Sequence, residues 1–243
     1  MNIRFRFVGL LLLTLFATGC TTLNGPRDPR DPFEGYNRAM YDFNSDFDKA
    51  LFRPLAEGYQ NVVPQPVNNG ISNFFSNLDD VLVMFNDILQ LKFEQTLSDF
   101  SRFVWNTTVG LFGFIDVATP MDLPKHNEDF GQTLGYWGLN SGPYLVLPFL
   151  GPSSVRDGTG LVADWQVDPV SQVNNPDQRW ALIGLEAVDT RAGLLRASNI
   201  LDTAALDPYT FMRDAYLQRR ESLVYDGNPP VTDEFDPFAE ELN

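Results

Sequence analysis

One long stretch with a single continuous apolar face constrains the fold more than any other feature of this chain. Between residues 71 and 91 apolar residues recur at steps of three and one, the spacing of one side of an α-helix. They are Ile71, Phe74, Phe75, Leu78, Val81, Leu82, Phe85, Ile88 and Leu89. Asn73, Asn77, Asp80 and Asp87 leave the opposite side polar, and no segment shows the alternation of a strand. The sequence therefore predicts an all-α fold.

Further helices are predicted where start signals precede helical spacing. A helix begins near Tyr36 and continues to about residue 51, where Pro54 ends it or starts a new segment. Ser98 is the expected N-cap of a helix over 98–111, and Ser153 or Ser154 caps one that ends near residue 165. The pairs Asn175-Pro176 and Asp207-Pro208 open helices that end near residues 201 and 227.

Three segments do not fit this helical pattern. Residues 103–118 are strongly apolar but contain Asn106 and Asp116 and are too short for a full span, which suits a buried or half-membrane element. Residues 119–134 are expected to form a loop. Residues 142–152 (GPYLVLPFLGP) form an apolar loop bracketed by Gly and Pro, and its prolines exclude a long helix and a central strand.

The N-terminus has the order of a secretory signal: basic Arg4 and Arg6, a short apolar run, then small residues that lead to Cys20. The end of this segment resembles a bacterial lipobox, in which the cysteine is acylated and becomes the first residue of the mature protein. Thr21 follows where aspartate usually signals inner-membrane retention, so the resemblance implies export to the outer membrane. The alternative is an ordinary cleaved signal with an incidental cysteine.

Composition excludes several classes of function. The net charge of −15 opposes nucleic-acid binding, and no basic cluster offsets it. A single Cys excludes an intrachain disulfide, and with a single His it makes a zinc or copper site improbable. No polybasic patch attracts anionic lipid, so membrane attachment has to rest on acyl chains and apolar surface.

The chain offers little for catalysis. His126 lies in a polar loop, where we expect a solvent-facing side chain, and no serine occupies a Gly-x-Ser-x-Gly elbow. Residues 158–160 (GTG) lack the strand and the Lys of a phosphate loop. Asp79 and Asp80 point about 100° apart on a helix, so we expect a solvated face rather than a carboxylate pair. The sequence predicts a protein that is not an enzyme.

Ordered motifs resemble the MlaA (VacJ) family of outer-membrane lipoproteins. They are DPFEGYNR at 31–38 with FN at 43–44, VPQP at 63–66, GFIDVA at 113–118, FGQTLG at 130–135, GPYLVLPF at 142–149, RD at 156–157 and DPY at 207–209. The resemblance implies one ring-like helical domain over 33–227 with short irregular loops. Residues 1–19 are then the lipoprotein signal peptide, 20–32 a flexible lipidated tether, and 228–243 a disordered acidic tail.

The resemblance also implies a function. Family members lie in the inner leaflet of the outer membrane beside trimeric porins, remove phospholipids mislocalised to the outer leaflet through an amphipathic channel, and pass them to the soluble periplasmic carrier MlaC. No cofactor is implied beyond the acyl and diacylglycerol groups on Cys20. Two rival functions are a structural lipoprotein that scaffolds porins without moving lipid, and a lipid hydrolase with an unrecognised nucleophile.

The implied transport function suggests candidate site residues, and for several of them an ordinary structural role is the alternative. Channel or gate candidates are Phe43, Asn44, Pro143, Tyr144, Leu147, Pro148, Phe149 and Arg156; membrane-facing candidates are Phe74, Phe75, Phe112 and Phe114. We hypothesise that Phe43 packs inward and controls the ring, and that Arg156 meets a lipid phosphate. The alternatives are a core helix face for Phe43, a local salt bridge for Arg156, and core packing for the 71–91 face and for the 142–152 loop.

Overall fold

The computed structural model describes residues 28–230 and confirms the all-α prediction, with one small β-hairpin added. The signal peptide, Cys20, tether residues 21–27 and tail residues 231–243 lie outside the described residues. The elements are α2 (Glu34–Phe47), a π-helical segment η1 (Asp48–Phe52), α3 (Arg53–Val62), α4 (Gln65–Leu89), α5 (Phe93–Thr108), a 3-10 turn η2 (Thr119–Met121), α6 (Phe130–Tyr136), β1 (Tyr144–Leu147), β2 (Gly151–Ser154), α7 (Val155–Val167), α8 (Pro176–Ala204) and α9 (Pro208–Val224).

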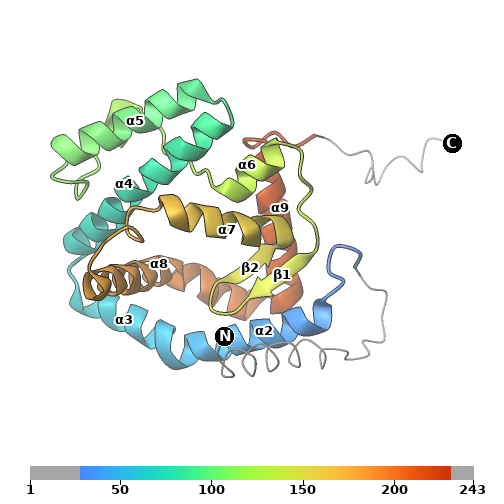
Figure 1. Ribbon diagram of the computed structural model, residues 1–243. Coiled ribbons are helices and arrows are strands. Elements are labelled where there is room, and N and C mark those ends of the chain that lie inside the picture. Colours follow the sequence, from blue (N-terminus) through green and yellow to red (C-terminus); the bar gives the residue numbers. More distant parts are fainter. Residues whose placement is uncertain (1–27, 231–243) are drawn as a thin grey trace, which may run out of the picture.

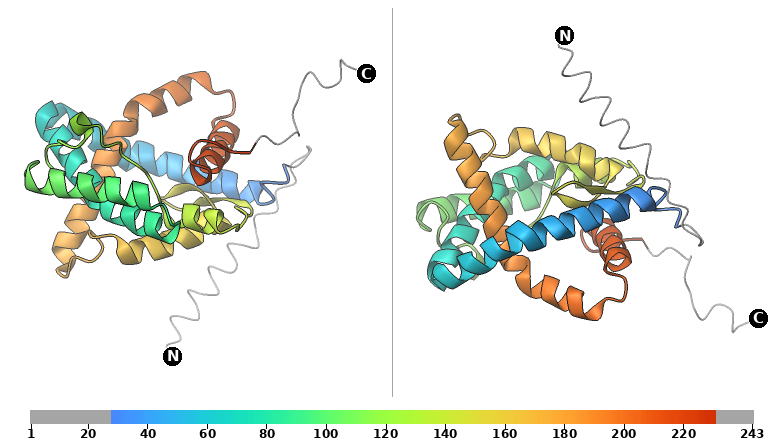
Figure 2. Two further views of the ribbon diagram at one scale, coloured as in Figure 1. Left: turned by 90° about the horizontal axis from the view of Figure 1, so that it is seen from above. Right: turned by 90° about the horizontal axis from the view of Figure 1, so that it is seen from below.

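The helices form a rim with two helices crossing inside it (Figure 1). In that view α2 and α3 run along one side, the α4–α5 hairpin covers another, α6 and α9 complete the circuit, and α7 and α8 cross the middle. Figure 2 shows that α8 crosses α3 and that its C-terminal end projects beyond α3 before the chain turns into α9. This ring-like arrangement agrees with the predicted fold class.

Helix starts with a capping side chain are confirmed. Ser154 accepts a hydrogen bond from the Asp157 backbone N–H at the start of α7, and Asp207 does the same for Thr210 at the start of α9. Asn175 caps α8, where Pro176 fills the first helical position.

The structure differs from the sequence-based boundaries in four places. Helix α5 begins at Phe93 rather than at Ser98, and Pro54 lies inside a helix that runs on through η1 into α3. The segment 119–134 is not all loop, because α6 begins at Phe130 after the capping residue Asp129. Residues 144–154 form a β-hairpin, in which Pro152 faces Val146. Val146 donates its backbone N–H to Asn37 rather than to β2, so Pro152 stands opposite a residue that exchanges no sheet hydrogen bond with it and its missing N–H costs none.

The polarity of the α4–α5 hairpin is inverted relative to a soluble domain. The buried positions of α4 are mostly polar, and those of α5 are Asp99, Arg102 and Asn106, all on one face. Asp80 was expected on a solvated face but is 1% exposed, and its carboxylate receives a hydrogen bond from Lys125 Nζ at 2.5 Å. The loop that carries Lys125 closes over these polar faces, so the hairpin turns its apolar side outward.

Large apolar side chains therefore lie exposed along the outside of this hairpin. They are Phe85, Ile88, Leu91, Phe93, Leu97, Phe100, Val104, Trp105, Val109, Leu111, Phe112, Phe114 and Ile115. Among the described residues twenty polar or charged side chains are buried, against ten apolar ones. No helix among residues 28–230 combines the length and apolarity needed to span a bilayer. Contiguous exposed apolar surface on this scale marks an interaction site.

The last tether residues belong to the folded body. Asp31 is 1% exposed and accepts hydrogen bonds from Asn37 Nδ2, at 2.7 Å, and from the Tyr209 hydroxyl. Arg213 from α9 lies 3.5 Å from the same carboxylate. Residues 28–32, which were predicted as the end of a flexible tether over 20–32, are therefore part of the folded domain.

Candidate functional site

Two asparagines on α2 hold the β-hairpin in place. Asn37 donates to the Tyr144 carbonyl at 3.0 Å and accepts from the Val146 backbone N–H at 2.8 Å. Asn44, two helical turns further on, donates to the Leu147 carbonyl at 2.9 Å and accepts from the Phe149 backbone N–H at 2.7 Å. Residues seven apart lie on one helix face, so α2 supplies amide partners along one edge of the hairpin.

Four phenylalanines gather where the hairpin turn meets α2. The rings of Phe47 and Phe149 are 4.9 Å apart in an edge-to-face arrangement, and Phe52 packs on Phe47 at 5.6 Å. Phe43 stacks on Phe47 and meets Phe149 edge-on at 5.3 Å. Phe43 is 43% exposed. The expectation that Phe43 packs inward is thus corrected: it forms an outer layer on Phe47 and Phe149.

A cavity of about 460 Å³, the α2–α8 cavity, is lined by three of these phenylalanines, Phe47, Phe52 and Phe149. Its lining combines apolar side chains, from Phe47, Phe52, Phe149, Leu150, Ile183, Ala187 and Leu194, with polar ones, from Asn44, Asp48, Glu186, Thr190 and Arg191. The α8 residues recur at three- and four-residue steps, so one face of α8 forms the long side of the cavity. An amphipathic molecule would find both surfaces it needs here.

Charges in the lining of this cavity are partly paired. Arg191 donates from Nε to Asp48 Oδ1 at 2.6 Å and from Nη2 to Asp48 Oδ2 at 2.8 Å, and these bonds hold the pKa of Asp48 below its usual range. Arg53 lies 3.5 Å from the same carboxylate. Burial, together with Asp168, Asp79 and Asp189, raises the pKa of Glu186 to about 7.

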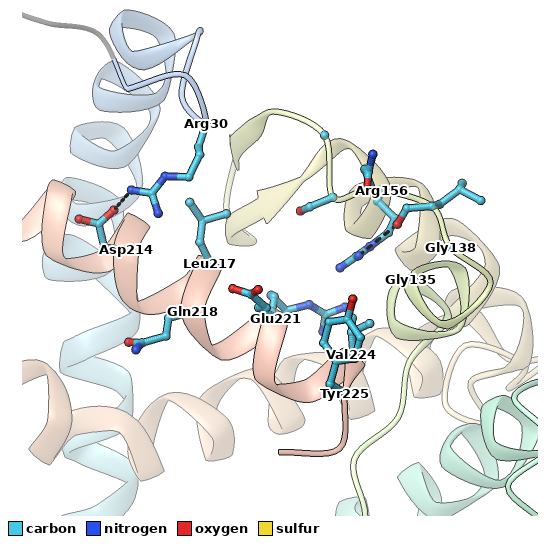
Figure 3. A pocket seen from close by; sticks show the side chains of 15 residues that line it. Arg30, Gly135, Gly138, Arg156, Asp214, Leu217, Gln218, Glu221, Val224 and Tyr225 are labelled. Atoms are coloured by element: carbon cyan, nitrogen blue, oxygen red, sulfur yellow. Dashed lines mark hydrogen bonds and ion pairs between the residues drawn. The ribbon is translucent and has the colours of Figure 1, made fainter. Parts of the chain in front are cut away.

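A second pocket, of about 590 Å³, lies between α9 and the segment after α6 (Figure 3). Its guanidinium groups are already neutralised. Arg30 pairs with Asp214 at 3.1 Å, and Arg156, which is 8% exposed, pairs with Asp157 at 2.9 Å and points toward the Leu139 carbonyl. Of the two partners expected for Arg156, a lipid phosphate or a local salt bridge, the structure shows the salt bridge, with Asp157. With paired charges and a polar lining, this pocket suits acyl chains less well than the α2–α8 cavity.

A buried ionic network joins α6, α7 and α9 beside that pocket. Arg220 Nη2 lies 2.8 Å from Asp129 Oδ1 and 3.0 Å from Asp157 Oδ1, and the Tyr216 hydroxyl donates to Asp157 at 2.6 Å. Burial alone would raise the pKa of Asp157, but Arg220 and Tyr216 outweigh it and lower the pKa. These bonds fix the helices that frame the pocket.

The interior of the α4–α5 hairpin holds an unusual acidic pair. Asp87 and Asp99 are both fully buried, and His126 Nδ1 lies 2.8 Å from Asp99 Oδ2. Burial and the neighbouring Asp99 raise the pKa of Asp87 to about 8. The expectation of a solvent-facing His126 is corrected, because this ring is half-buried against α5.

The tip after α5 presents apolar side chains through an unusual backbone. Leu111 and Phe112 adopt φ values of 54° and 60°, followed by Gly113 at 89°. Backbone bonds from Phe112 to Thr107 and from Gly113 to Asn106 maintain the turn. A Cβ on Gly113 would lie 2.7 Å from the Asn77 side chain, so glycine is required. This geometry leaves Phe112 as an exposed apolar tip, and its contact with a membrane stays a prediction.

The remaining sequence candidates divide between surface and core. Phe114 is exposed and stacks on Phe74 at 5.2 Å, whereas Phe75 is 6% exposed and cannot face a membrane. Tyr144 is fully buried among Tyr41, Tyr209 and Tyr216, so it belongs to the core rather than to a channel. Pro143 is half-buried beside the start of α7, and Pro148 is exposed in the hairpin turn.

Sequence reasoning brought together Asn44, Leu147 and Phe149, which are neighbours, but missed most of the cavity wall. Asp48, Phe52, Glu186 and Arg191 were not singled out. The sequence did contain a pattern that could have indicated Glu186, because this carboxylate lies beside the apolar helix face formed by Ile183, Ala187 and Leu194.

An apolar outer surface, a polar interior and an amphipathic cavity define a class of helical proteins whose exterior suits apolar surroundings. Comparisons with known proteins identify the family. The family model described as MlaA lipoprotein matches residues 29–223, and the chain belongs to the MlaA lipoprotein family.

Relatives and a solved structure agree. The chain is 40% identical to the Escherichia coli K12 protein called "Intermembrane phospholipid transport system lipoprotein MlaA", over 92% of this chain and 90% of that protein. The Haemophilus influenzae protein of the same name is 35% identical, over 89% of each chain. A chain solved in work on the structural basis for maintenance of bacterial outer membrane lipid asymmetry matches with a TM-score of 0.71 and 37% identity, covering 82% of this chain and all of that one.

Proposed function

We propose that this protein is a lipoprotein of intermembrane phospholipid transport that removes mislocalised phospholipids from the outer leaflet of the outer membrane. The observation that carries the proposal is the inverted polarity of the fold, with apolar side chains outside and an amphipathic cavity inside. A phospholipid combines a charged head with apolar tails, so its path needs both surfaces. Membership in the MlaA family supports the same reading.

The anchor and the partners complete the proposal. Acyl and diacylglycerol groups on Cys20 would hold the protein at the periplasmic face of the outer membrane, since two or more chains give stable attachment where one is marginal. The exposed apolar tip around Phe112 would sit among lipid tails. Trimeric porins would lie beside the ring, and the periplasmic carrier MlaC would accept the lipid.

The proposal involves no covalent chemistry. His126 hydrogen-bonds with Asp99, and no serine hydroxyl contacts it in the described part of the chain, so the arrangement of a serine nucleophile with its base is lacking there. A scaffold that binds porins without moving lipid is the rival function, but it gives no reason for a cavity lined by both apolar and polar side chains.

The test is the phospholipid content of the outer leaflet in cells that lack this protein, compared with complemented cells, by chemical labelling of surface-exposed aminophospholipid. We expect a rise in the deletion that the intact protein reverses. A Cys20→Ala variant should leave the outer membrane and fail to complement. An unchanged outer leaflet in the deletion would refute the transport function and favour the scaffold.

A further inference from the structure

Two carboxyl groups face each other in the polar interior of the α4–α5 hairpin. Asp87 on α4 and Asp99 on α5 are both 0% exposed, and their side chains hydrogen-bond to each other. No N–H group within residues 28–230 donates to either oxygen of Asp87 or to Asp99 Oδ1. A carboxylate only accepts hydrogen bonds, so a bond between two carboxyl groups requires a proton on one of them. The geometry therefore indicates one proton shared by this pair.

The charged groups around the pair do not neutralise it. The cations of the hairpin interior are engaged by other carboxylates: Lys92 by Glu128 and Asp226, Lys125 by Asp79 and Asp80, and Arg102 by Asp116. On α7, Asp164 accepts a hydrogen bond from Asn86, the residue before Asp87, at 3.3 Å. The titratable group in direct contact is His126, whose Nδ1 lies 2.8 Å from Asp99 Oδ2.

His126 belongs to a strap, residues 122–129, that crosses the inner side of the hairpin. Before His126, Lys125 Nζ donates to a backbone carbonyl of α4 at 2.8 Å. After it, Glu128 Oε2 accepts from Gln90 Nε2, just beyond the end of α4, at 2.8 Å. Residues 127–129 then form part of the lining of a cavity of about 330 Å³ between α4 and α9. The strap therefore connects the buried acidic pair to a cavity wall.

We propose that the proton shared by Asp87 and Asp99 is a latch that holds the strap closed against the hairpin. With the proton in place, the two carboxyl groups attract each other and the contact with His126 is kept. Without it, two negative charges repel each other at hydrogen-bonding distance in a buried site, and the strap opens. Rising pH therefore loosens this wall of the cavity between α4 and α9, and falling pH closes it. The latch is a regulatory device that goes beyond the proposed transport function.

Proton linkage gives the direction and the size of the effect. Burial and the neighbouring Asp99 raise the pKa of Asp87 to about 8, whereas an opened latch exposes a carboxyl with an ordinary pKa of about 4. The closed strap is fully stabilised below the ordinary value, and this stabilisation is lost as the pH rises to the raised one. Between about pH 5 and 8 opening should become about tenfold more frequent per pH unit and then level off.

The test uses limited proteolysis of the intact protein in detergent by endoproteinase Lys-C, which cleaves after Lys125 in the strap. Rates from about pH 6 to about pH 9 are divided by those for an unfolded peptide of the same sequence, so that they report opening. We expect the ratio to rise about tenfold per pH unit and to level off above about pH 8. Asp87→Asn keeps the shape of the side chain but cannot ionise, and should remove the rise. Asp46→Asn, at an exposed position of α2, should leave it unchanged.

A second measurement needs no variant. His126 is the only histidine of the chain, so protein labelled with ¹⁵N-histidine gives the ring signals of one residue. Because Nδ1 lies against Asp99, loss of the shared proton should shift these signals with a midpoint at about pH 8, as a step separate from the titration of the ring itself.

A cleavage ratio that does not change with pH, or the same rise in Asp87→Asn, would overturn the latch. A single titration step in the ring signals of the unaltered protein would overturn it as well. Equal cleavage after Lys125 and after Lys49, which lies in the helical segment η1, would show that the whole fold opens rather than the strap. None of these outcomes bears on lipid transport, because none of them measures lipid.

Discussion

Replacing Arg220 by Ala tests whether the ionic network of α6, α7 and α9 holds the fold together. The substitution leaves Asp129 and Asp157 without their guanidinium partner, and Asp157 is only 7% exposed. Removing one partner of a buried pair costs about 3–5 kcal/mol, and we take the lower end, about 3 kcal/mol, because Asp129 is one third exposed. For a chain of this size that corresponds to a fall in Tm of about 6–12 °C.

The pH dependence gives the sharper signature. In the unaltered protein Arg220 lowers the pKa of both carboxylates, so their stabilising contribution is present above the unfolded value near about 4 and is lost as the pH falls through the folded pKa. Without Arg220 the pKa of both carboxylates rises, although Tyr216 and Arg156 at Asp157 and Gln132 at Asp129 still favour the charged forms, so the carboxylates of the variant take up protons at a higher pH than those of the unaltered protein. The difference between the two proteins should therefore shrink on acidification.

The assay is thermal unfolding in detergent, followed by circular dichroism at pH 7 and pH 5. Arg219→Ala is the matched control, because Arg219 is exposed and has no ion-pair or hydrogen-bond partner within residues 28–230. We expect a change in Tm below 2 °C for this control, about the effect of an ordinary surface substitution. Equal losses for Arg219 and Arg220, or a gap that does not change with pH, would refute the reasoning.

Three further outcomes are expected. Asn37→Ala should lower the free energy of unfolding, measured in urea, by about 3 kcal/mol, and Asn44→Ala, at a less buried position, should lower it by about 1 kcal/mol. The reverse order would contradict the conclusion that these two asparagines hold the β-hairpin in place. Because the pKa of Asp87 is raised to about 8, this carboxyl is protonated in the folded protein at neutral pH, and the free energy of unfolding falls as the pH rises from 5 to 8. Asp87→Asn should reduce that fall by about 1.4 kcal/mol per pH unit. An unaltered slope would show that the burial of Asp87 beside Asp99 does not cause the fall. Phe112→Ser should weaken binding to phospholipid vesicles at least about tenfold, whereas Leu206→Ser, an exposed site between α8 and α9, should not; equal effects would argue against an inserted tip.

Local features of this fold could be read from sequence because their causes are local. Ser154, Asn175 and Asp207 bond to backbone groups two or three residues away, so a short motif contains the whole interaction. Helix α5 was placed five residues late because no side chain caps it; the turn at Leu91, with φ of 60°, sets its start instead.

What sequence could not supply is the direction in which an amphipathic helix faces. The spacing in 71–91 defines an apolar side, but a protein core and a lipid phase attract the same residues, so Asp80 and Asp87 were expected outside and lie inside. The cavity depends on pairs far apart in the chain: Asn44 meets Phe149, and Asp48 meets Arg191, across more than a hundred residues. No local pattern encodes such pairs.

The inverted distribution of polar and apolar side chains also affects how the protein responds to temperature. The positive heat capacity of unfolding comes from apolar surface newly exposed to solvent, and exposure of polar surface lowers it. Here many large apolar side chains are outside in the folded state, and unfolding releases mainly polar groups from the interior. The heat-capacity increment per residue is therefore expected to lie below the usual value of about 12–15 cal/mol/K. Its stability curve is correspondingly flat, so moderate cooling or warming changes the folded fraction little.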